Sequence, residues 1–299
     1  MRTVVENPPI ANIFQAPRTA HNARRRASNI AIVFFSLLAT AFAVAVLFYL
    51  LLYVLRAGLP YINVDLFTKI PTANGEPGGG LANAIQGSLI LVGLASLFGV
   101  PLGLFTGIYL SEFGRGAIAT GVRFLVDVLT GIPTIIFGLF AWVFIVVPQQ
   151  SFSGLAGGVA LGIIMIPIVA RTSEEVLRLV PKELREASFA LGATESRTII
   201  QVVIPAARNG IITGIFLSMA RVAGETAPLL MTAFGAPFFT SDITQPMDAL
   251  PLRIFNFAES PYPAQINQAY AGSLVLILLI LLTSFAIRWA TGGFRRSGR

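Results

Sequence analysis

Six long runs of apolar residues constrain this 299-residue chain more than any other feature. A hydrocarbon core of about 30 Å needs roughly 20 apolar residues in a helix, because each helical residue adds only about 1.5 Å. The runs predict transmembrane helices at residues 30–55, 84–110, 124–147, 157–170, 210–233 and 272–289. We therefore expect an all-α membrane protein with six transmembrane helices.

The placement of Lys and Arg predicts the orientation of these helices, because cytoplasmic loops carry an excess of both residues. With the N-terminus inside, 17 of the 21 Lys and Arg residues fall on the inner side and three on the outer side. The remaining one, Arg221, falls inside the fifth apolar run. This orientation predicts cytoplasmic tails at residues 1–29 and 291–299 and external loops at 56–83 and 234–271. Within the second external loop, the string P-M-D-A-L-P-L-R-I-F-N-F-A predicts a short amphipathic helix at the outer interface.

The composition excludes several kinds of chemistry. The chain has no cysteine and one histidine, His21, so thiolate metal sites and histidine-based catalysis are not expected. No G-x-x-x-x-G-K-[S/T] string occurs, so we expect no ATP binding by this chain. The net charge is +7, and the charged residues flank the apolar runs. This arrangement is typical of a membrane protein and not of a nucleic-acid-binding one. The prediction is a non-catalytic chain with no metal and no cofactor of its own.

One Arg and one Glu fall inside the fifth apolar run. Arg221 lies eleven residues into that run, where an unpaired charge costs on the order of 3 kcal/mol. Glu225 is four residues further on, so a continuous helix would place both side chains on one face and allow them to pair. Gly224 and Pro228 are expected to bend this helix or expose its backbone. The pair is either a packing feature or the charged lining of an anion path, since a guanidinium matches a tetrahedral oxyanion through paired hydrogen bonds.

A second group of charges ends the fourth run, in I-P-I-V-A-R-T-S-E-E. Arg171, Glu174 and Glu175 fall within about one helical turn there. They are either interfacial charges that end the helix, or Arg171 is a second station for the anion. Asp127 in the third run lies four residues after Arg123, so we expect these two to pair in a structural role.

Glycines recur at spacings of four in three segments. The series are Gly99–Gly103–Gly107, Gly154–Gly158–Gly162 and Gly210–Gly214. Small residues at this spacing let helix backbones approach closely in lipid. The series predict close packing in a bundle or dimer without naming the partner helix.

A charged segment separates the fourth and fifth runs and reads R-E-A-S-F-A-L-G-A-T-E-S-R-T-I-I-Q-V-V-I-P. Glu186, Ala187 and Ser188 are followed by Gly192 after three residues, and an aliphatic-x-aliphatic-Pro group follows after nine more. This layout, within residues 182–205, resembles the EAA loop of permeases of binding-protein-dependent ABC importers. The resemblance implies a type I (MetI-like) bundle and a pair of short cytoplasmic helices that dock into an ATPase subunit. Without it, the segment reads as a solvated amphipathic loop.

Four further strings resemble the PstA family of phosphate ABC permeases. They are G-I-P-T-I-I-F-G-L-F (131–140), R-T-S-E-E-V-L-R-L-V-P (171–181), R-V-A-G-E-T-A-P-L-L (221–230) and P-M-D-A-L-P-L-R-I-F-N-F-A (246–258). The resemblance covers most of residues 84–290 and implies an importer subunit for inorganic phosphate in the bacterial cytoplasmic (inner) membrane. The implied partners are a second permease (PstC), two copies of an ATPase subunit (PstB) that binds ATP and Mg, and an external phosphate-binding protein (PstS).

For such an importer we predict roles for particular residues. Arg221 and Glu225 would line the central path and Arg171 would lie at its inner exit, while residues 186–188 and Gly192 would couple the permease to the ATPase. Three alternatives stay open: an ABC permease for another oxyanion such as sulfate or molybdate, a secondary ion-coupled anion carrier, and a regulatory membrane subunit that does not conduct.

Overall fold

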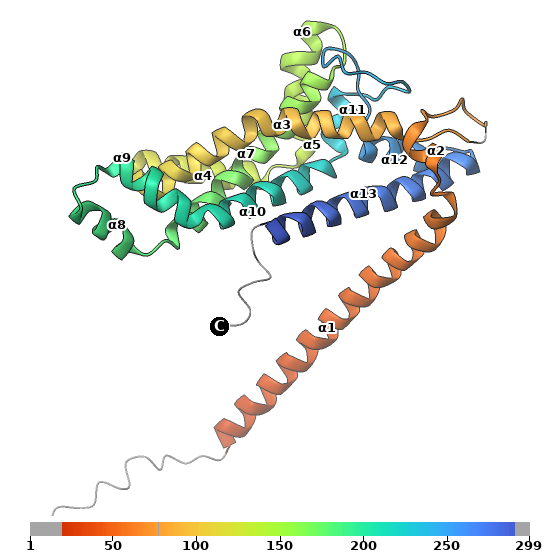
Figure 1. The fold of residues 1–299 in the computed structure, drawn as a ribbon. Coiled ribbons are helices and arrows are strands. Elements are labelled where there is room, and N and C mark those ends of the chain that lie inside the picture. The colour runs from red at the N-terminus through yellow and green to blue at the C-terminus, as the bar shows by residue number, and fades with distance from the viewer. Residues whose placement is uncertain (1–19, 77, 291–299) are drawn as a thin grey trace, which may run out of the picture. The chain divides into compact units, whose positions relative to one another are not determined.

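The computed structural model describes residues 20–76 and 78–290, which are mostly helical and contain no β-strand (Figure 1). The long helices are α1 (Ala20–Gly58), α3 (Ala82–Ile108), α4 (Gly116–Gly131), α7 (Gly154–Arg178), α10 (Ile204–Ala223) and α13 (Pro263–Ala290). The shorter segments are η2 (Leu59–Tyr61), α2 (Val64–Thr68), η3 (Tyr109–Phe113), α5 (Thr134–Ala141), η4 (Trp142–Val146), α6 (Val147–Gln149), α8 (Lys182–Ala190), α9 (Glu195–Thr198), η5 (Ile199–Val203), α11 (Ala227–Thr232) and α12 (Leu250–Ala258). The predicted all-α class is confirmed. Of the predicted tails, residues 1–19 and 291–299 lie outside the described residues, and residues 20–29 belong to α1.

Five of the helical stretches that the structure describes are long and apolar enough to cross a membrane. They are Ser28–Tyr61, Ala82–Phe113, Gly154–Arg178, Glu195–Ala223 and Pro263–Phe285. A sixth crossing is obtained only if α4 and the helix that follows it count as one span. These two helices are bent by 99° relative to each other at a short break. The break contains Pro133, which cannot donate a backbone hydrogen bond. The predicted third run is therefore interrupted by a bend, and the predicted fourth run extends at both ends.

The fifth span ends earlier than predicted, and this changes the positions of Arg221 and Glu225 relative to the helix. The helical stretch begins at Glu195 and ends at Ala223, so Arg221 lies in the last turn of α10. Gly224 caps the helix, and Glu225 lies in the break before α11. The expectation that Arg221 and Glu225 share one face of a continuous helix is wrong. The helix ends just before Gly224, the glycine that was expected to bend it.

The two units of the chain are residues 1–53 and 54–299. In the first unit, the most apolar stretch of α1 has no buried residue. In the second unit, Figure 1 shows α8 and α9 at one end of α3, α7 and α10, and α12 at the other end. The short helix predicted within residues 246–258 is found as α12, and it lies at the opposite end of these helices from the predicted coupling loop.

The second unit is built around the contact between α3 and α7. Gly99, Gly103 and Gly107 all face α7, and a Cβ added to Gly103 would lie 2.7 Å from Val169 Cβ and 2.8 Å from the Ile166 carbonyl oxygen. Real side chains do not tolerate such distances, so the two backbones approach as closely as only glycine permits. The close packing predicted from glycine spacing is found here between two helices of the same chain.

The loop between α11 and α13 is attached to the N-terminal end of α3 by a buried polar cluster. The Asp248 carboxylate is 1% exposed and accepts hydrogen bonds from Asn83 Nδ2 (2.9 Å), Arg253 Nε (2.7 Å) and the Ala249 backbone N–H (3.0 Å). Burial raises the pKa of Asp248, and Arg253 opposes this rise. Since folding raises this pKa, the stability that the group contributes is fully present below its ordinary pKa of 3.8 and is lost as pH rises through the raised value.

A glycine substitution tests whether the contact of α3 with α7 organises the fold. Gly103→Ala should lower the free energy of unfolding by about 1–3 kcal/mol, because the new methyl group must displace Val169 or the α7 backbone. Gly93→Ala in the same helix is the control, since nothing lies within 4 Å of its Cβ position. Thermal unfolding in detergent should show a lower midpoint for the first variant alone. Equal midpoints for the two variants would contradict the packing argument.

Candidate functional site

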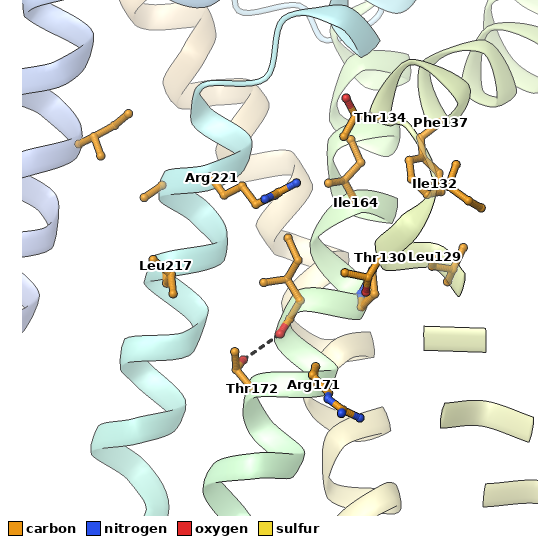
Figure 2. Close-up of a pocket in the computed structure, with 14 residues that line it drawn as sticks. Leu129, Thr130, Ile132, Thr134, Phe137, Ile164, Arg171, Thr172, Leu217 and Arg221 are labelled. Carbon is orange, nitrogen blue, oxygen red and sulfur yellow. Dashed lines mark hydrogen bonds between the residues drawn. The ribbon is translucent and has the colours of Figure 1, made fainter. Parts of the chain in front are cut away.

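A cavity of about 580 Å³ lies between two groups of helices in the second unit (Figure 2). One wall comes from α4, the short break after it, α5 and α7, and the other comes from α10 with one residue of α13. Its volume is in the range of small-molecule binding sites. Most lining side chains are apolar, and the polar ones are Thr130, Thr134, Arg171, Thr172 and Arg221. Both arginines predicted for the anion path therefore line one cavity.

Arg221 is the unpaired charge of this cavity. Figure 2 shows its side chain extending from α10 into the space facing α7. Among the described residues its guanidinium has no ion pair and no hydrogen bond, and the residue is exposed. Its position in the last turn of α10 is favourable for a cation, because the carbonyl ends of the helix carry partial negative charge. Its donors are free for an anionic ligand.

Arg171 lines the same cavity with its charge already shared among carboxylates. Its guanidinium lies 3.1 Å from Glu175, 3.7 Å from Asp127 and 3.9 Å from Glu174, measured between nearest N and O atoms. Its side chain is 47% exposed, so each of these pairs is partly screened by solvent. An anion that reaches Arg171 must compete with these carboxylates, whereas an anion at Arg221 need not.

Two of the predicted ion pairs are not formed. Glu225 makes no ion pair with Arg221 and does not line the cavity, because it lies beyond the end of α10. Asp127 pairs with Arg171 and not with Arg123, although a spacing of four residues permits the latter. Arg123 instead binds Glu174 with an N–O distance of 2.7 Å. The buried Glu174 carboxylate is stabilised more by pairing with the Arg123 guanidinium than the exposed Asp127 carboxylate would be.

Glu174 is the centre of a buried charge cluster and not an interfacial charge that ends a helix. Its side chain is 2% exposed, and its Oε1 lies 2.7 Å from both Arg123 Nε and Arg178 Nη2. Arg123 also donates to the carbonyl oxygens of Leu110 (2.7 Å) and Gly114 (3.1 Å). The cluster joins α4 and α7 to the π-helical turn η3 at the end of α3.

The predicted coupling loop has the expected pair of short helices, α8 and α9. Glu186 and Ala187 are exposed on α8. Ser188 is buried, and its hydroxyl lies 2.8 Å from Thr198 Oγ1, which joins α8 to α9. Gly192 has a φ of +80°, so the turn between the helices requires a residue without a side chain. The role of these residues in coupling stays a prediction.

Sequence reasoning missed the residues that attach this loop to the bundle. Arg185 on α8 binds Glu112 in η3 through two N–O contacts of 2.9 and 3.1 Å. The two residues are 73 positions apart, so no local spacing indicates the pair. Only the position of Arg185 directly before Glu186 could have drawn attention to it.

Comparison with known proteins places these features in a family. Residues 99–296 match the family described as "binding-protein-dependent transport system inner membrane component". The chain belongs to this family and, with its apolar helices, is a multi-pass membrane protein.

Curated relatives narrow the assignment within the family. The phosphate transport system permease protein PstA of Yersinia pestis is 41% identical over 279 residues, covering 93% of this chain and 94% of the relative. The PstA protein of Xylella fastidiosa strain Temecula1 is 44% identical, covering 89% and 93%. A probable PstA protein of Methanocaldococcus jannaschii is 38% identical, covering 84% and 89%. The PstA proteins are thus the branch of the family to which this sequence is similar along most of its length.

Solved structures support the fold. An inward-facing MetNI methionine ABC transporter chain matches with a TM-score of 0.60 and 24% identity, covering 71% of this chain and 95% of that one. A bacterial ABC transporter involved in the import of alginate matches with a TM-score of 0.59 and 15% identity, covering 93% and 100%. These likenesses confirm the predicted MetI-like bundle.

The neighbours Glu174 and Glu175 provide a test of the charge cluster. Glu174→Ala should lower the free energy of unfolding by about 1.5–3 kcal/mol, because it removes the charge-assisted hydrogen bonds with Arg123 and Arg178, whose side chains are 26% and 52% exposed. Glu175→Ala removes a carboxylate that is 64% exposed and should change stability by less than about 1 kcal/mol. Chemical or thermal unfolding in detergent measures both. A loss at Glu175 as large as that at Glu174 would show that burial is not what gives the cluster its strength.

Proposed function

We propose that this chain is the permease subunit of an ATP-driven importer of inorganic phosphate and forms half of the translocation path. The similarity to PstA proteins along most of the chain supports the cargo. The observation that carries the proposal is the cavity in which Arg221 offers unpaired donors to an anion. An arginine fork suits phosphate because its N–H groups match two oxygens of the ion at once.

The path through this chain begins at Arg221 and continues to Arg171. Both line the cavity, and the second is held by Asp127 and Glu175 until an anion replaces them. The apolar remainder of the cavity wall strengthens the attraction of the guanidinium for the anion by lowering the local dielectric. Glu225 is left outside this path, since it lies beyond the cavity.

The energy for transport comes from partners. A second permease completes the path, two ATPase subunits bind ATP and Mg in the cytoplasm, and an external phosphate-binding protein delivers the ion. The chain itself catalyses no reaction. It lies in the bacterial cytoplasmic membrane with both termini inside, in keeping with the excess of Lys and Arg on that side.

Movement follows from the position of the coupling loop. The α8–α9 pair runs through η5 directly into α10, which carries Arg221. Closure of the ATPase dimer against α8 therefore moves one wall of the cavity, and the site alternates between the two sides of the membrane. Sulfate or molybdate import is the second candidate, because a guanidinium also binds those oxyanions. A secondary carrier is disfavoured by the exposed coupling helix.

Replacement of Arg221 tests the path. Arg221→Gln should lower phosphate uptake by about tenfold or more, because a charge-assisted hydrogen bond to the ion contributes about 1.5–3 kcal/mol. Arg221→Lys should retain part of the uptake, since it keeps the charge and loses the fork. Arg208→Gln is the control: it removes one exposed arginine from the same helix and should leave uptake unchanged. Radiolabelled phosphate uptake into cells that depend on this permease provides the measurement, and full uptake by Arg221→Gln would contradict the assignment.

The cargo and the energy source are tested together by reconstitution. Proteoliposomes that contain the assembled complex and the binding protein should accumulate phosphate only when ATP is supplied on the side of the ATPase. Excess unlabelled phosphate should suppress the uptake of label, and equimolar sulfate or molybdate should not. Uptake driven by an ion gradient without ATP would identify a secondary carrier, and suppression by sulfate would identify the other oxyanion importer.

A further inference from the structure

Arg185 is the side chain through which the coupling helix α8 contacts the rest of the bundle most extensively. Its Nε and Nη2 bind the two carboxylate oxygens of Glu112 at 3.1 and 2.9 Å. Its Nη1 donates to the Val180 carbonyl oxygen at 2.6 Å, and its Nη2 donates to that of Leu177 at 3.1 Å. The Leu177 carbonyl belongs to the last turn of α7, and Val180 lies in the short link between α7 and α8. One guanidinium thus fastens α8 to both η3 and α7.

This contact is withdrawn from water and geometrically constrained. The Glu112 side chain is 8% exposed and that of Arg185 is 19% exposed. Ser111 donates a further hydrogen bond to Glu112 Oε1 at 2.8 Å. A paired arginine–carboxylate contact fixes orientation as well as distance. It differs in this respect from the exposed pairs of Arg171, which solvent screens.

The turn that carries Glu112 is also held from the opposite side. Arg123 of α4 donates to the carbonyls of Leu110 and Gly114, which flank Glu112 in and after η3. Arg123 also binds Glu174 of α7. A continuous chain of charged contacts therefore leads from α8 through η3 to α4 and α7. Those two helices form the cavity wall opposite Arg221.

We propose that Glu112 and Arg185 are positioning residues that make α8 move as one body with α4 and α7, so that ATP hydrolysis is coupled to movement of that cavity wall. The inference rests on the proposed function. The backbone connects α8 to α10 by a separate route through α9 and η5. With the Glu112–Arg185 contact intact, a push on α8 reaches both walls of the cavity. Without it, α8 stays joined to α7 only through the backbone link 179–181, so the push moves that wall less than it moves α10, and hydrolysis continues while fewer ions are carried.

The absence of cysteine in this chain allows a direct test by replacement and rescue. Glu112→Cys with Arg185→Cys, in the assembled complex with cysteine-free partners, should hydrolyse ATP while the phosphate imported per ATP falls by about fivefold or more. A short bifunctional thiol cross-linker between the two cysteines should restore the ratio towards that of the unmodified complex, because it re-creates the joint between η3 and α8 that Glu112 and Arg185 form. A wild-type ratio without the cross-linker, or no recovery with it, would overturn the proposal.

Two further arms keep the result interpretable. Glu112→Gln keeps the shape of the side chain and should lower the ratio in the same direction, whereas Asp65→Asn breaks an exposed ion pair with Lys69 in the external loop and should not. Failure of the unmodified complex to import phosphate would count against the proposed function and not against the joint.

A distance measurement tests the joint without disturbing it. Spin labels on Glu183→Cys in α8 and Ile118→Cys in α4, both at exposed positions, should give the same distance distribution in the nucleotide-free and ATP-bound complexes. Glu112→Gln should broaden that distribution. A shift between nucleotide states in the otherwise unmodified chain would show that α8 moves independently of α4 and would overturn the proposal.

Discussion

The close contact of α3 with α7 is the constraint on which the rest of the second unit depends. Glycines at 99, 103 and 107 remove the side chains that would otherwise hold the two helices apart. Within a membrane, water gives no hydrophobic drive for helix association, so this close van der Waals packing carries much of the stability. With α7 fixed in this way, the helices that pack against it form the two walls of the cavity. Gly210 and Gly214 bring α10 to the second face of α7 in the same manner, against Val176 and Thr172.

The charges divide into those that hold the fold and those left free. Glu112 and Glu174 are buried carboxylates, and each is paired with arginine from a different segment of the chain. Losing one partner would leave a buried charge uncompensated, which makes these contacts rigid joints. Arg221 has no such partner among the described residues and faces a cavity. Its donors stay available to an anion that enters the cavity, and this contrast connects the packing of the bundle to transport.

Local patterns in the sequence predicted the features that depend on local geometry. Apolar runs located the spans and glycine spacing indicated close packing, whereas the two short helices were implied by the resemblance of the segment around Glu186 to the EAA loop. Two of the errors come from the assumption of an unbroken helix. Gly224 ends α10 before Glu225, and Pro133 marks a bend of 99°. The pairs Arg123–Glu174 and Glu112–Arg185 join residues 51 and 73 positions apart, so only the packed structure brings them together.

In the proposed mechanism, an ATPase subunit binds α8 and drives the movement of this permease through it. A photo-reactive amino acid at the exposed position Ala187 tests it most directly in cells that express the whole system. We expect a cross-linked product between this chain and a nucleotide-binding subunit, with a yield that changes when ATP hydrolysis is blocked. Cross-links to lipid alone, with no nucleotide-binding protein captured in any nucleotide state, would contradict it.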